Sequence, residues 1–356
     1  MQSDGKLACV IAAGGTGGHV APSIAVAEAL SRRRVRVTFA GSPDRLEARL
    51  VPEAGFEFDP FHVSGFPREP SLALLRALAA AGRAPFACRE ILGRRHPDVV
   101  LGGGGYVGGP MVLAAWTRRI PAALTEADAH LGLANRLAAP FARRVFLSFP
   151  IVGRNPPKFS VTGRPVPSGS RVTSREEGRR RFELPSDGPV LLVFGGSQGA
   201  RSLNELVVRE LGAAGPAVLH LAGERDFAAL RGRVSRPDYR LVPYTHEFGA
   251  ALGSCDLVLC RAGGSIHDLA LAGKPAVLVP YPHATAGHQT KNARYFERAG
   301  AALVVPDVEL ERVPGVVREL LGDPARLAEM SERMRSVARP HAADEIAEEL
   351  IRLAGR

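Results

Sequence analysis

Short, almost purely apolar segments recur along the chain, each followed by glycine and then by a helix-like pattern. Examples are LACVIAA (7–13), VRVTFAG (35–41), DVVLGG (98–103) and PVLLVFGG (189–196). Such runs are typical of parallel strands covered on both faces, because neither row of side chains then meets water. Their alternation with helices predicts an α/β fold of doubly wound parallel sheets.

The order of these segments repeats within the chain. The stretch VIAAGGTGGHVAPSIAVAEAL (10–30) matches LLVFGGSQGARSLNELVVREL (191–211). Similarly, DVVLGGGGYVGGPMVLAAW (98–116) matches DLVLCRAGGSIHDLALAGKP (256–275). Each member is a strand, a glycine turn and a helix, so we expect two Rossmann-like domains. A length of 356 residues agrees with this, because it exceeds one typical core.

The seam between the repeats lies near NPPKFSVTGRPVPSGS (155–170), which is rich in proline, glycine and serine. We place the first domain at 1–163 and the second at 164–340. The segment 341–356 contains ADEIAEELIRLAG, which has the pattern of an amphipathic helix. This helix either completes the second domain or packs back on the first.

Nearly all of the excess positive charge lies in the first half of the chain. The net charge is +10; residues 1–165 hold 21 Lys and Arg against 12 Asp and Glu, and the remainder holds 25 against 24. This asymmetry indicates an anionic partner, which is nucleic acid, an acidic membrane surface or a phosphorylated ligand. An arginine-rich composition without any partner explains it equally well.

The sequence lacks the usual signals of a secreted or membrane-spanning protein. The four cysteines, Cys9, Cys88, Cys255 and Cys260, have no metal-ligand spacing, which favours a reduced cytoplasmic protein. We expect no signal peptide, because the first residues lack a basic region followed by a long apolar one. No strongly apolar stretch reaches the roughly 18 residues of a membrane span, so we expect no transmembrane helix.

Four glycine-rich loops, at 14–18, 102–109, 195–199 and 263–264, follow predicted strands. Ligands collect at the carboxyl ends of parallel strands, where glycine allows close approach and helix N–H groups attract phosphate. The loops lack the lysine of a P-loop, and the third glycine and ribose-binding acid of a dinucleotide fold are missing. Together they predict a cleft for a phosphorylated ligand, although tight turns alone explain any single loop.

Five motifs in order resemble the MurG family of N-acetylglucosaminyltransferases over residues 7 to about 340. They are GGTGGHVAPSIAVAEAL, GGGGYVGGP, TEADAHLGLANRLAA, FGGSQGARSLNE and RAGGSIHDLALAGKPAVLVPYPHATAGHQTKNA. The resemblance implies the GT-B architecture, with two Rossmann-like domains facing across a cleft. It implies inverting transfer of GlcNAc from UDP-GlcNAc to the C4 hydroxyl of undecaprenyl-pyrophosphoryl-MurNAc-pentapeptide, converting lipid I to lipid II in peptidoglycan synthesis.

The resemblance also implies the partners and the location. We expect peripheral attachment to the cytoplasmic face of the plasma membrane through anionic inner-membrane lipids. Other cell-wall synthesis proteins are expected partners, and nucleic acid is not.

The transfer needs a base that takes the acceptor proton. His19 begins a helix, where the dipole disfavours the imidazolium, so it is a candidate base. Hydrogen bonding to the acceptor alone is an equally open role. Glu126 is the other candidate; its alternative is a structural carboxylate bonded to loop amides. The resemblance assigns acceptor binding to Thr16, Gly17, Gly18, His19, Gly104 and Tyr106.

Donor binding is likewise assigned by resemblance. The predicted donor residues are Thr16, Gly17, Gly18, Asp128, Arg164, Ser197, Gln198, Thr245, Gly264, Ser265, Asp268, His288 and Gln289. Several positions depart from the family pattern. Asp128 replaces an asparagine and only accepts hydrogen bonds when ionised, and Asp268 replaces a longer glutamate. Pro167 stands where the family has an arginine, for which Arg164 or Arg171 is a candidate substitute.

A membrane-binding patch is predicted around the segment SLALLRALAAAGRAPFACREILGRR (71–95), because apolar residues rimmed by arginine suit an acidic lipid surface. Its predicted members are Leu72, Leu75, Arg76, Leu78, Arg83, Phe86 and Trp116. An ordinary core-facing helix is the alternative. We expect no bound metal and no cofactor, since backbone amides and helix ends face the pyrophosphate, no D-x-D motif occurs, and UDP-GlcNAc is a substrate.

Two other functions stay open at this point. One is another enzyme of the same architecture, either a diacylglycerol sugar transferase or a UDP-GlcNAc 2-epimerase; the epimerase would lack the arginine-rimmed patch and GGGGYVGGP. The other is a non-catalytic protein that binds a nucleotide sugar, which the departures at the donor positions leave possible.

Overall fold

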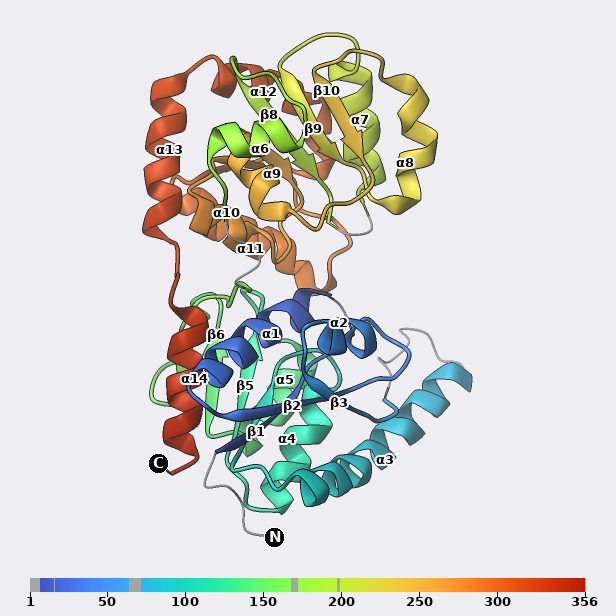
Figure 1. The fold of residues 1–356 in the computed structure, drawn as a ribbon, viewed down its shortest axis with the longest axis vertical. Coiled ribbons are helices and arrows are strands. Elements are labelled where there is room, and N and C mark those ends of the chain that lie inside the picture. Colours follow the sequence, from blue (N-terminus) through green and yellow to red (C-terminus); the bar gives the residue numbers. More distant parts are fainter. Residues whose placement is uncertain (1–6, 16, 64–71, 168–171, 197–198, 356) are drawn as a thin grey trace. The chain divides into compact units, whose positions relative to one another are not determined.

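The structure is a computed structural model that describes residues 7–15, 17–63, 72–167, 172–196 and 199–355. Two compact units divide the chain (Figure 1). Each unit is built around one parallel sheet with helices on both faces. The two Rossmann-like units predicted from the sequence are thereby confirmed.

The first unit comprises Met1–Pro167 together with Pro340–Arg356, and the second comprises Ser168–Arg339. The division falls four residues after the boundary expected from the sequence. The reason is local: Arg164, after the last strand of the first sheet, donates a hydrogen bond of 2.7 Å to the Gly18 carbonyl oxygen. That bond keeps the segment after the strand with the first unit.

The sheet of the first unit has the strand order β3-β2-β1-β4-β5-β6-β7, all parallel. Its strands are β1 Ala8–Ala12, β2 Arg36–Gly41, β3 Glu57–Pro60, β4 Val99–Gly102, β5 Ala122–Glu126, β6 Arg144–Leu147 and β7 Phe159–Val161. Alternation along β1 divides the core. Cys9 and Ile11 pack on one face, and Val10 and Ala12 on the other.

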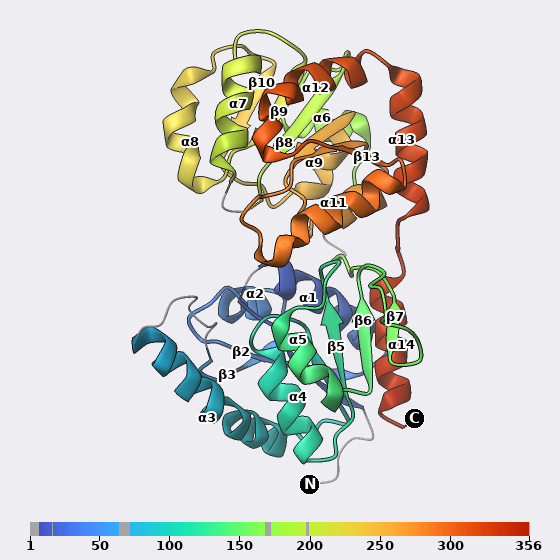
Figure 2. The same ribbon diagram turned by 180° about the vertical axis from the view of Figure 1, so that it is seen from behind.

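The helices of the first unit cover both faces of this sheet. They are α1 Gly17–Arg32, α2 Glu47–Glu53, α3 Leu72–Arg95, α4 Gly108–Thr117, α5 Leu133–Ala138 and α14 Ala342–Leu353. Figure 2 shows α3, α4 and α5 together on one side. On the other face α14 packs beside α1, and Arg33 donates to Asp344 at 2.6 Å. The last helix therefore belongs to the first unit.

The second unit has the strand order β10-β9-β8-β11-β12-β13, again parallel. Its strands are β8 Val190–Phe194, β9 Ala217–Leu221, β10 Tyr239–Val242, β11 Leu257–Cys260, β12 Ala276–Leu278 and β13 Ala302–Val304. Its helices are α6 Arg175–Arg181, α7 Arg201–Leu211, α8 Glu224–Leu230, α9 Phe248–Ser254, α10 Ile266–Ala272, α11 His288–Arg298, α12 Val313–Leu321 and α13 Pro324–Ser336.

The internal repeat is visible in the topology. In the first sheet β1 lies between β2 and β4, and in the second β8 lies between β9 and β11. The four glycine loops therefore follow equivalent central strands of the two sheets. This is the place where a doubly wound sheet leaves room for a ligand.

Candidate functional site

The first glycine loop, between β1 and α1, is held by a buried carboxylate. Glu47, at the start of α2, accepts hydrogen bonds from the backbone N–H of Gly15 at 3.1 Å and of Ser42 at 3.1 Å. A side chain at Gly14 would overlap the Glu47 carboxylate, and Gly15 has a φ of 91°. Only glycine fits both positions. The sequence analysis did not anticipate Glu47, because nothing local links it to a loop 32 residues earlier.

His19, in the first turn of α1, lies against the second glycine loop. A β-carbon on Gly104 would come within 2.5 Å of His19 Cδ2, and Gly104 has a φ of 101°. A side chain at Gly105 would overlap the carbonyl oxygen of Gly14. The imidazole and both loops of the first unit are thus brought together. Gly17 and Gly18 begin α1, whereas Thr16 lies outside the described residues.

Tyr106 contributes a ring and an unpartnered hydroxyl to the same place. Its Cε1 would lie 3.0 Å from a β-carbon on Gly15, so the ring covers the first loop. The Tyr106 hydroxyl is buried and has no hydrogen-bond partner among the described residues. Buried hydroxyls in native proteins are normally paired, so this one is available to a ligand group.

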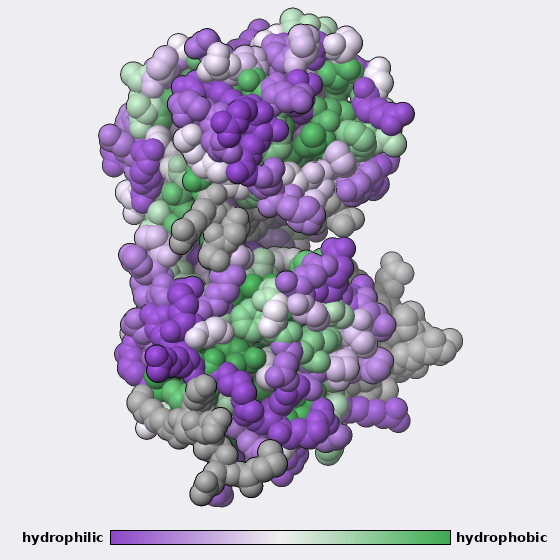
Figure 3. Space-filling model, viewed as in Figure 1, coloured by the Kyte–Doolittle hydropathy of each residue, from purple (hydrophilic) through white to green (hydrophobic). Residues whose placement is uncertain are grey.

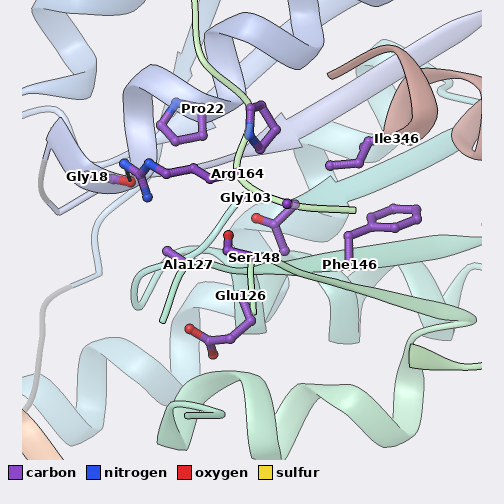
Figure 4. A pocket seen from close by; sticks show the side chains of 12 residues that line it. Gly18, Pro22, Gly103, Glu126, Ala127, Phe146, Ser148, Arg164 and Ile346 are labelled. Atoms are coloured by element: carbon purple, nitrogen blue, oxygen red, sulfur yellow. Dashed lines mark hydrogen bonds between the residues drawn. The ribbon is translucent and has the colours of Figure 1, made fainter. Parts of the chain in front are cut away.

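Glu126, at the end of β5, is occupied by its own loop. Its carboxylate accepts from the N–H of Asp128 at 3.2 Å, the N–H of Gly132 at 2.9 Å and the Asn135 side-chain amide at 2.9 Å. Figure 4 shows the carboxylate pointing away from the Arg164 guanidinium. Burial raises the pKa of Glu126, and the three donors oppose that rise. The contacts are those of a carboxylate that orders residues 127–135.

Arg164 is buried beside the first glycine loop, where its guanidinium bonds the Gly18 carbonyl oxygen (Figure 4). It lines a small pocket of about 10 Å³ together with Thr125, Ser148 and Ile346 of α14. Arg164 and Asp128, both predicted donor residues, therefore lie in the first unit. Asp128 is half-buried in the loop that Glu126 orders.

The third glycine loop, after β8, is the first predicted donor loop of the second unit. Gly196 and Gly199 have φ values of 93° and 73°, and a side chain at Gly199 would overlap the Ala222 carbonyl oxygen. That oxygen accepts a hydrogen bond of 2.8 Å from the Asn204 side chain. The predicted donor residues Ser197 and Gln198 lie outside the described residues.

A buried polar network lies beneath this loop. His220 contacts the Tyr239 hydroxyl through Nδ1 at 2.8 Å and the Asn204 Oδ1 through Nε2 at 3.0 Å. Because the Asn204 amide nitrogen donates to Ala222 and Asp226, its oxygen must accept. The geometry therefore assigns the proton to Nε2 of His220. Burial lowers the pKa of His220 to about 3, so the ring is neutral.

This network was not predicted from the sequence. Its only local signal was a histidine inside the apolar strand AVLHL (217–221).

The fourth glycine loop, between β11 and α10, follows a buried arginine. Arg261 donates to Ser202 Oγ at 2.8 Å and to the Val279 carbonyl oxygen at 3.2 Å, and it pairs with Asp307. These bonds fix the chain just ahead of the loop. The predicted donor residues Gly264, Ser265 and Asp268 are half-buried here, and Asp268 lies in the first turn of α10.

The remaining predicted donor residues lie in two nearby segments of the second unit. Thr245 Oγ1 accepts from the Glu247 N–H at 3.0 Å, which orders the segment after β10. His288 and Gln289 begin α11 and are half-buried. Gln289 Oε1 accepts from the Tyr281 N–H at 2.9 Å, so its amide nitrogen is the group left for a ligand.

The predicted membrane patch is described only in part. The backbone of α3 is described, but the side chains of Leu72, Leu75, Arg76 and Leu78 lie outside the described part. Phe86 is 75% exposed and Trp116 54% exposed, and Arg83 is exposed too. Two further leucines on the neighbouring helix α5, Leu133 and Leu137, are also exposed. They were not part of the predicted patch, which was based on the segment 71–95 and Trp116.

The described residues offer neither a metal cluster nor a membrane span. No group of three or more His, Cys, Asp or Glu side chains suited to a metal ion occurs among them. None of their helices has the length and apolarity required to cross a bilayer. The expectation of a protein without bound metal stays a prediction.

Comparison with known proteins gives consistent matches over both units. The profile of the glycosyltransferase family 28 N-terminal domain matches residues 9–147, and that of the family 28 C-terminal domain matches residues 190–347.

Two similar relatives are from Halothermothrix orenii and Halorhodospira halophila. The first is 38% identical over 94% of this chain and 95% of its own length; the second is 43% identical over 95% and 96%. Both are named UDP-N-acetylglucosamine–N-acetylmuramyl-(pentapeptide) pyrophosphoryl-undecaprenol N-acetylglucosamine transferase.

Among solved structures, MurG of Acinetobacter baumannii is similar, with a TM-score of 0.76 and 28% identity over 98% of this chain and 99% of that one. The UDP-GlcNAc 2-epimerase of Neisseria meningitidis has a TM-score of 0.66 and 14% identity over 98% of this chain and 100% of that one. The second likeness concerns the fold alone.

Proposed function

The chain belongs to glycosyltransferase family 28, and on this premise we propose that it is an inverting N-acetylglucosaminyltransferase of peptidoglycan synthesis. It transfers GlcNAc from UDP-GlcNAc to the C4 hydroxyl of undecaprenyl-pyrophosphoryl-MurNAc-pentapeptide, which converts lipid I to lipid II. The observation that carries the proposal is the contact of His19 with the second glycine loop, which itself lies against the first loop at Gly14. The names and near-complete coverage of the relatives support the substrates.

The first unit binds the acceptor. The start of α1, at Gly17 and Gly18, offers unpaired N–H groups and the positive end of the helix dipole to the lipid pyrophosphate. Gly104 keeps the second loop close enough for the acceptor to reach His19. The Tyr106 hydroxyl, buried and unpartnered among the described residues, donates to the acceptor.

His19 takes the acceptor proton. The C4 oxygen forms a bond to the anomeric carbon of GlcNAc while the bond from that carbon to the UDP phosphate oxygen breaks. The electron pair leaves with UDP, and the configuration inverts. Glu126 is assigned the positioning role, because three donors already occupy its carboxylate and none of them is a catalytic group.

The second unit binds the donor. Backbone N–H groups of Gly264 and Ser265 meet the UDP pyrophosphate, and Asp268 accepts from the ribose. The backbone of Thr245 meets the uracil, and His288 with the Gln289 amide meets the sugar. Ser197 and Gln198 are the other residues that we assign to nucleotide binding. Because backbone amides stabilise the leaving diphosphate, the protein supplies no metal ligand for this step.

Attachment to anionic lipid occurs through α3 and the end of α4. Phe86 and Trp116 insert their exposed rings, and Arg83 meets lipid phosphate. Leu133 and Leu137 extend this apolar surface, because α5 packs on α4 and the Trp116 ring lies 5.1 Å from Phe141, directly after α5.

A transfer assay with radiolabelled UDP-GlcNAc and a short-chain lipid acceptor tests the proposal. Incorporation of label into the lipid, unaffected by EDTA, is the expected result. Tight UDP binding without turnover would instead identify a nucleotide-sugar-binding protein. Conversion of UDP-GlcNAc to its 2-epimer without lipid would identify an epimerase, a class of enzyme whose fold the chain also resembles.

A further inference from the structure

A second pocket lies in the second unit, at the edge of the sheet opposite to the donor loops. Its volume is about 440 Å³, within the range of small-molecule sites. Pro189, Asp256 and Pro275, which line it, directly precede β8, β11 and β12, whereas the donor loops follow the other ends of these strands. This pocket, which we name the rear groove, is therefore separate from the donor site.

One wall of the rear groove is a face of α13. Pro324, Leu327, Ser331 and Arg335 line it and recur every three or four residues, so they lie on one side of that helix. The lined face is about 17 Å long at 1.5 Å per residue. Figure 1 shows α13 along the side of the unit next to α10, and the two helices are in contact.

The wall of the rear groove opposite α13 is positively charged. Lys274 is half-buried, and its ammonium group donates to the carbonyl oxygens of Cys255 at 2.7 Å and Gly253 at 3.4 Å. Within the described residues no carboxylate pairs with Lys274 or with Arg335, whose side chain lies over Gly273. Two cations thus face the rear groove without a protein counter-charge.

The one carboxylate of the rear groove is already neutralised. Asp256 accepts from the Val190 N–H at 2.8 Å and from Arg179 at 2.9 Å, and Arg175 lies 3.4 Å away. Arg175, at the start of α6, adds a third lining cation, and Figure 3 shows a strongly hydrophilic surface over α6. The balance of charge therefore favours an anion.

Most of the remaining lining is apolar. Leu321, Leu327 and Ala328, with the prolines at the strand starts, cover the surface between the cations. A small inorganic ion would leave this apolar surface in water, whereas a ligand with an apolar body would cover it.

We propose that the rear groove binds an organic anion with an apolar body. Lys274 and Arg335 hold its carboxylate or phosphate group, and Leu321 and Leu327 contact its apolar part. The site is independent of the proposed sugar transfer, because no residue of it belongs to the donor or acceptor loops.

The experiment uses the full chain and the fluorescent anion 8-anilinonaphthalene-1-sulfonate. Ala328→Trp fills the groove from an exposed helix position, and Arg335→Glu reverses an exposed charge. Each is expected to raise the dissociation constant of the probe at least 10-fold. Arg333→Glu, an exposed arginine of the same helix that does not line the groove, is the matched control and is expected to change it less than 2-fold.

Competition completes the test. Decyl phosphate or decanoate is expected to displace the probe, and the more effective of the two identifies the acidic group. UDP is expected not to displace it. The proposal is overturned if the parent chain does not bind the probe, if UDP displaces it, if neither amphiphile does, or if both groove variants bind like the parent. Unchanged UDP affinity and thermal unfolding in both variants exclude a folding defect.

Discussion

The imidazole of His19 lies directly on the backbone of Gly104, where a β-carbon would come within 2.5 Å of His19 Cδ2. The two residues belong to loops that follow neighbouring strands, β1 and β4. The absence of a side chain at position 104 thus determines where the imidazole lies. Any group added there moves the proposed base.

We predict that Gly104→Ala lowers kcat at least 10-fold while UDP affinity stays within 2-fold of the parent, because the proposed nucleotide site is in the other unit. His19→Ala should lower kcat by roughly 10²–10⁴-fold, the usual contribution of a general base. Gly153→Ala is the matched control, since Gly153 also has a positive φ of 74° but no neighbour within 4 Å. Equal loss of UDP affinity and turnover would contradict the assignment of the loop.

Glu126 should behave as a positioning residue. We predict that Glu126→Gln and Asn135→Ala lower kcat by similar factors, since each disturbs the hydrogen bonds that join Glu126 to its loop. The limb of the kcat/KM pH profile that reports the base should keep its position in both variants. If Glu126→Gln alone removed that limb, Glu126 would be the base.

The pH dependence of stability offers a separate check on Glu126. Folding raises its pKa above the ordinary 4.5, so the native state holds the proton more tightly than the unfolded chain. Its contribution to the free energy of unfolding is therefore greatest below pH 4.5 and declines as the pH rises through the raised pKa. Urea unfolding followed by Trp116, the only tryptophan, should show this decline in the parent and not in Glu126→Gln.

For His220, in the second unit, we predict the opposite dependence of stability on pH. Its pKa is lowered from 6.5 to about 3, so the native ring stays neutral while the unfolded chain takes up a proton below pH 6.5. The parent should therefore lose stability as the pH falls below 6.5, by about 1.4 kcal/mol per pH unit until the folded pKa is reached.

His220→Gln retains a hydrogen-bonding side chain without this titration. Between pH 7.5 and pH 5 the parent should lose about 2 kcal/mol more than the variant, measured by urea unfolding and circular dichroism. Equal losses would show that His220 is not neutral and buried in the native state.

Membrane attachment should depend on both apolar contact and charge. We predict that Phe86→Ser with Trp116→Ser weakens sedimentation with anionic vesicles at least 10-fold, and that added salt or charge reversal at Arg76 and Arg83 weakens it too. Val152→Ser, also fully exposed in the first unit, is the control and should bind like the parent. Binding that is indifferent to salt and to all of these changes would remove the electrostatic proposal.

Much of the fold was predictable because its signals are local. The apolar runs LACVIAA (7–13), DVVLGG (98–103), PVLLVFGG (189–196) and DLVLC (256–260) were recognised as strands, and each proved to be central in its sheet. The edge strand β3 Glu57–Pro60 carries two charged residues among its four, so its pattern is weak. Most of the observed strands are one to three residues shorter than the runs: β8 Val190–Phe194, for example, leaves out the proline and both glycines of PVLLVFGG (189–196).

The sequence by itself determined the strand–glycine–helix unit, its duplication, and the loops in which His19, Gly104 and Gly264 lie. Backbone preferences and the spacing of hydrophobic residues act over a few residues, so they predict local structure without knowledge of the fold. Only the tertiary structure decided that Glu47 and Glu126 are held by loop amides, and that His220 is a neutral member of a buried network. Those roles depend on partners that the chain brings together only by folding, and no spacing in the sequence encodes them.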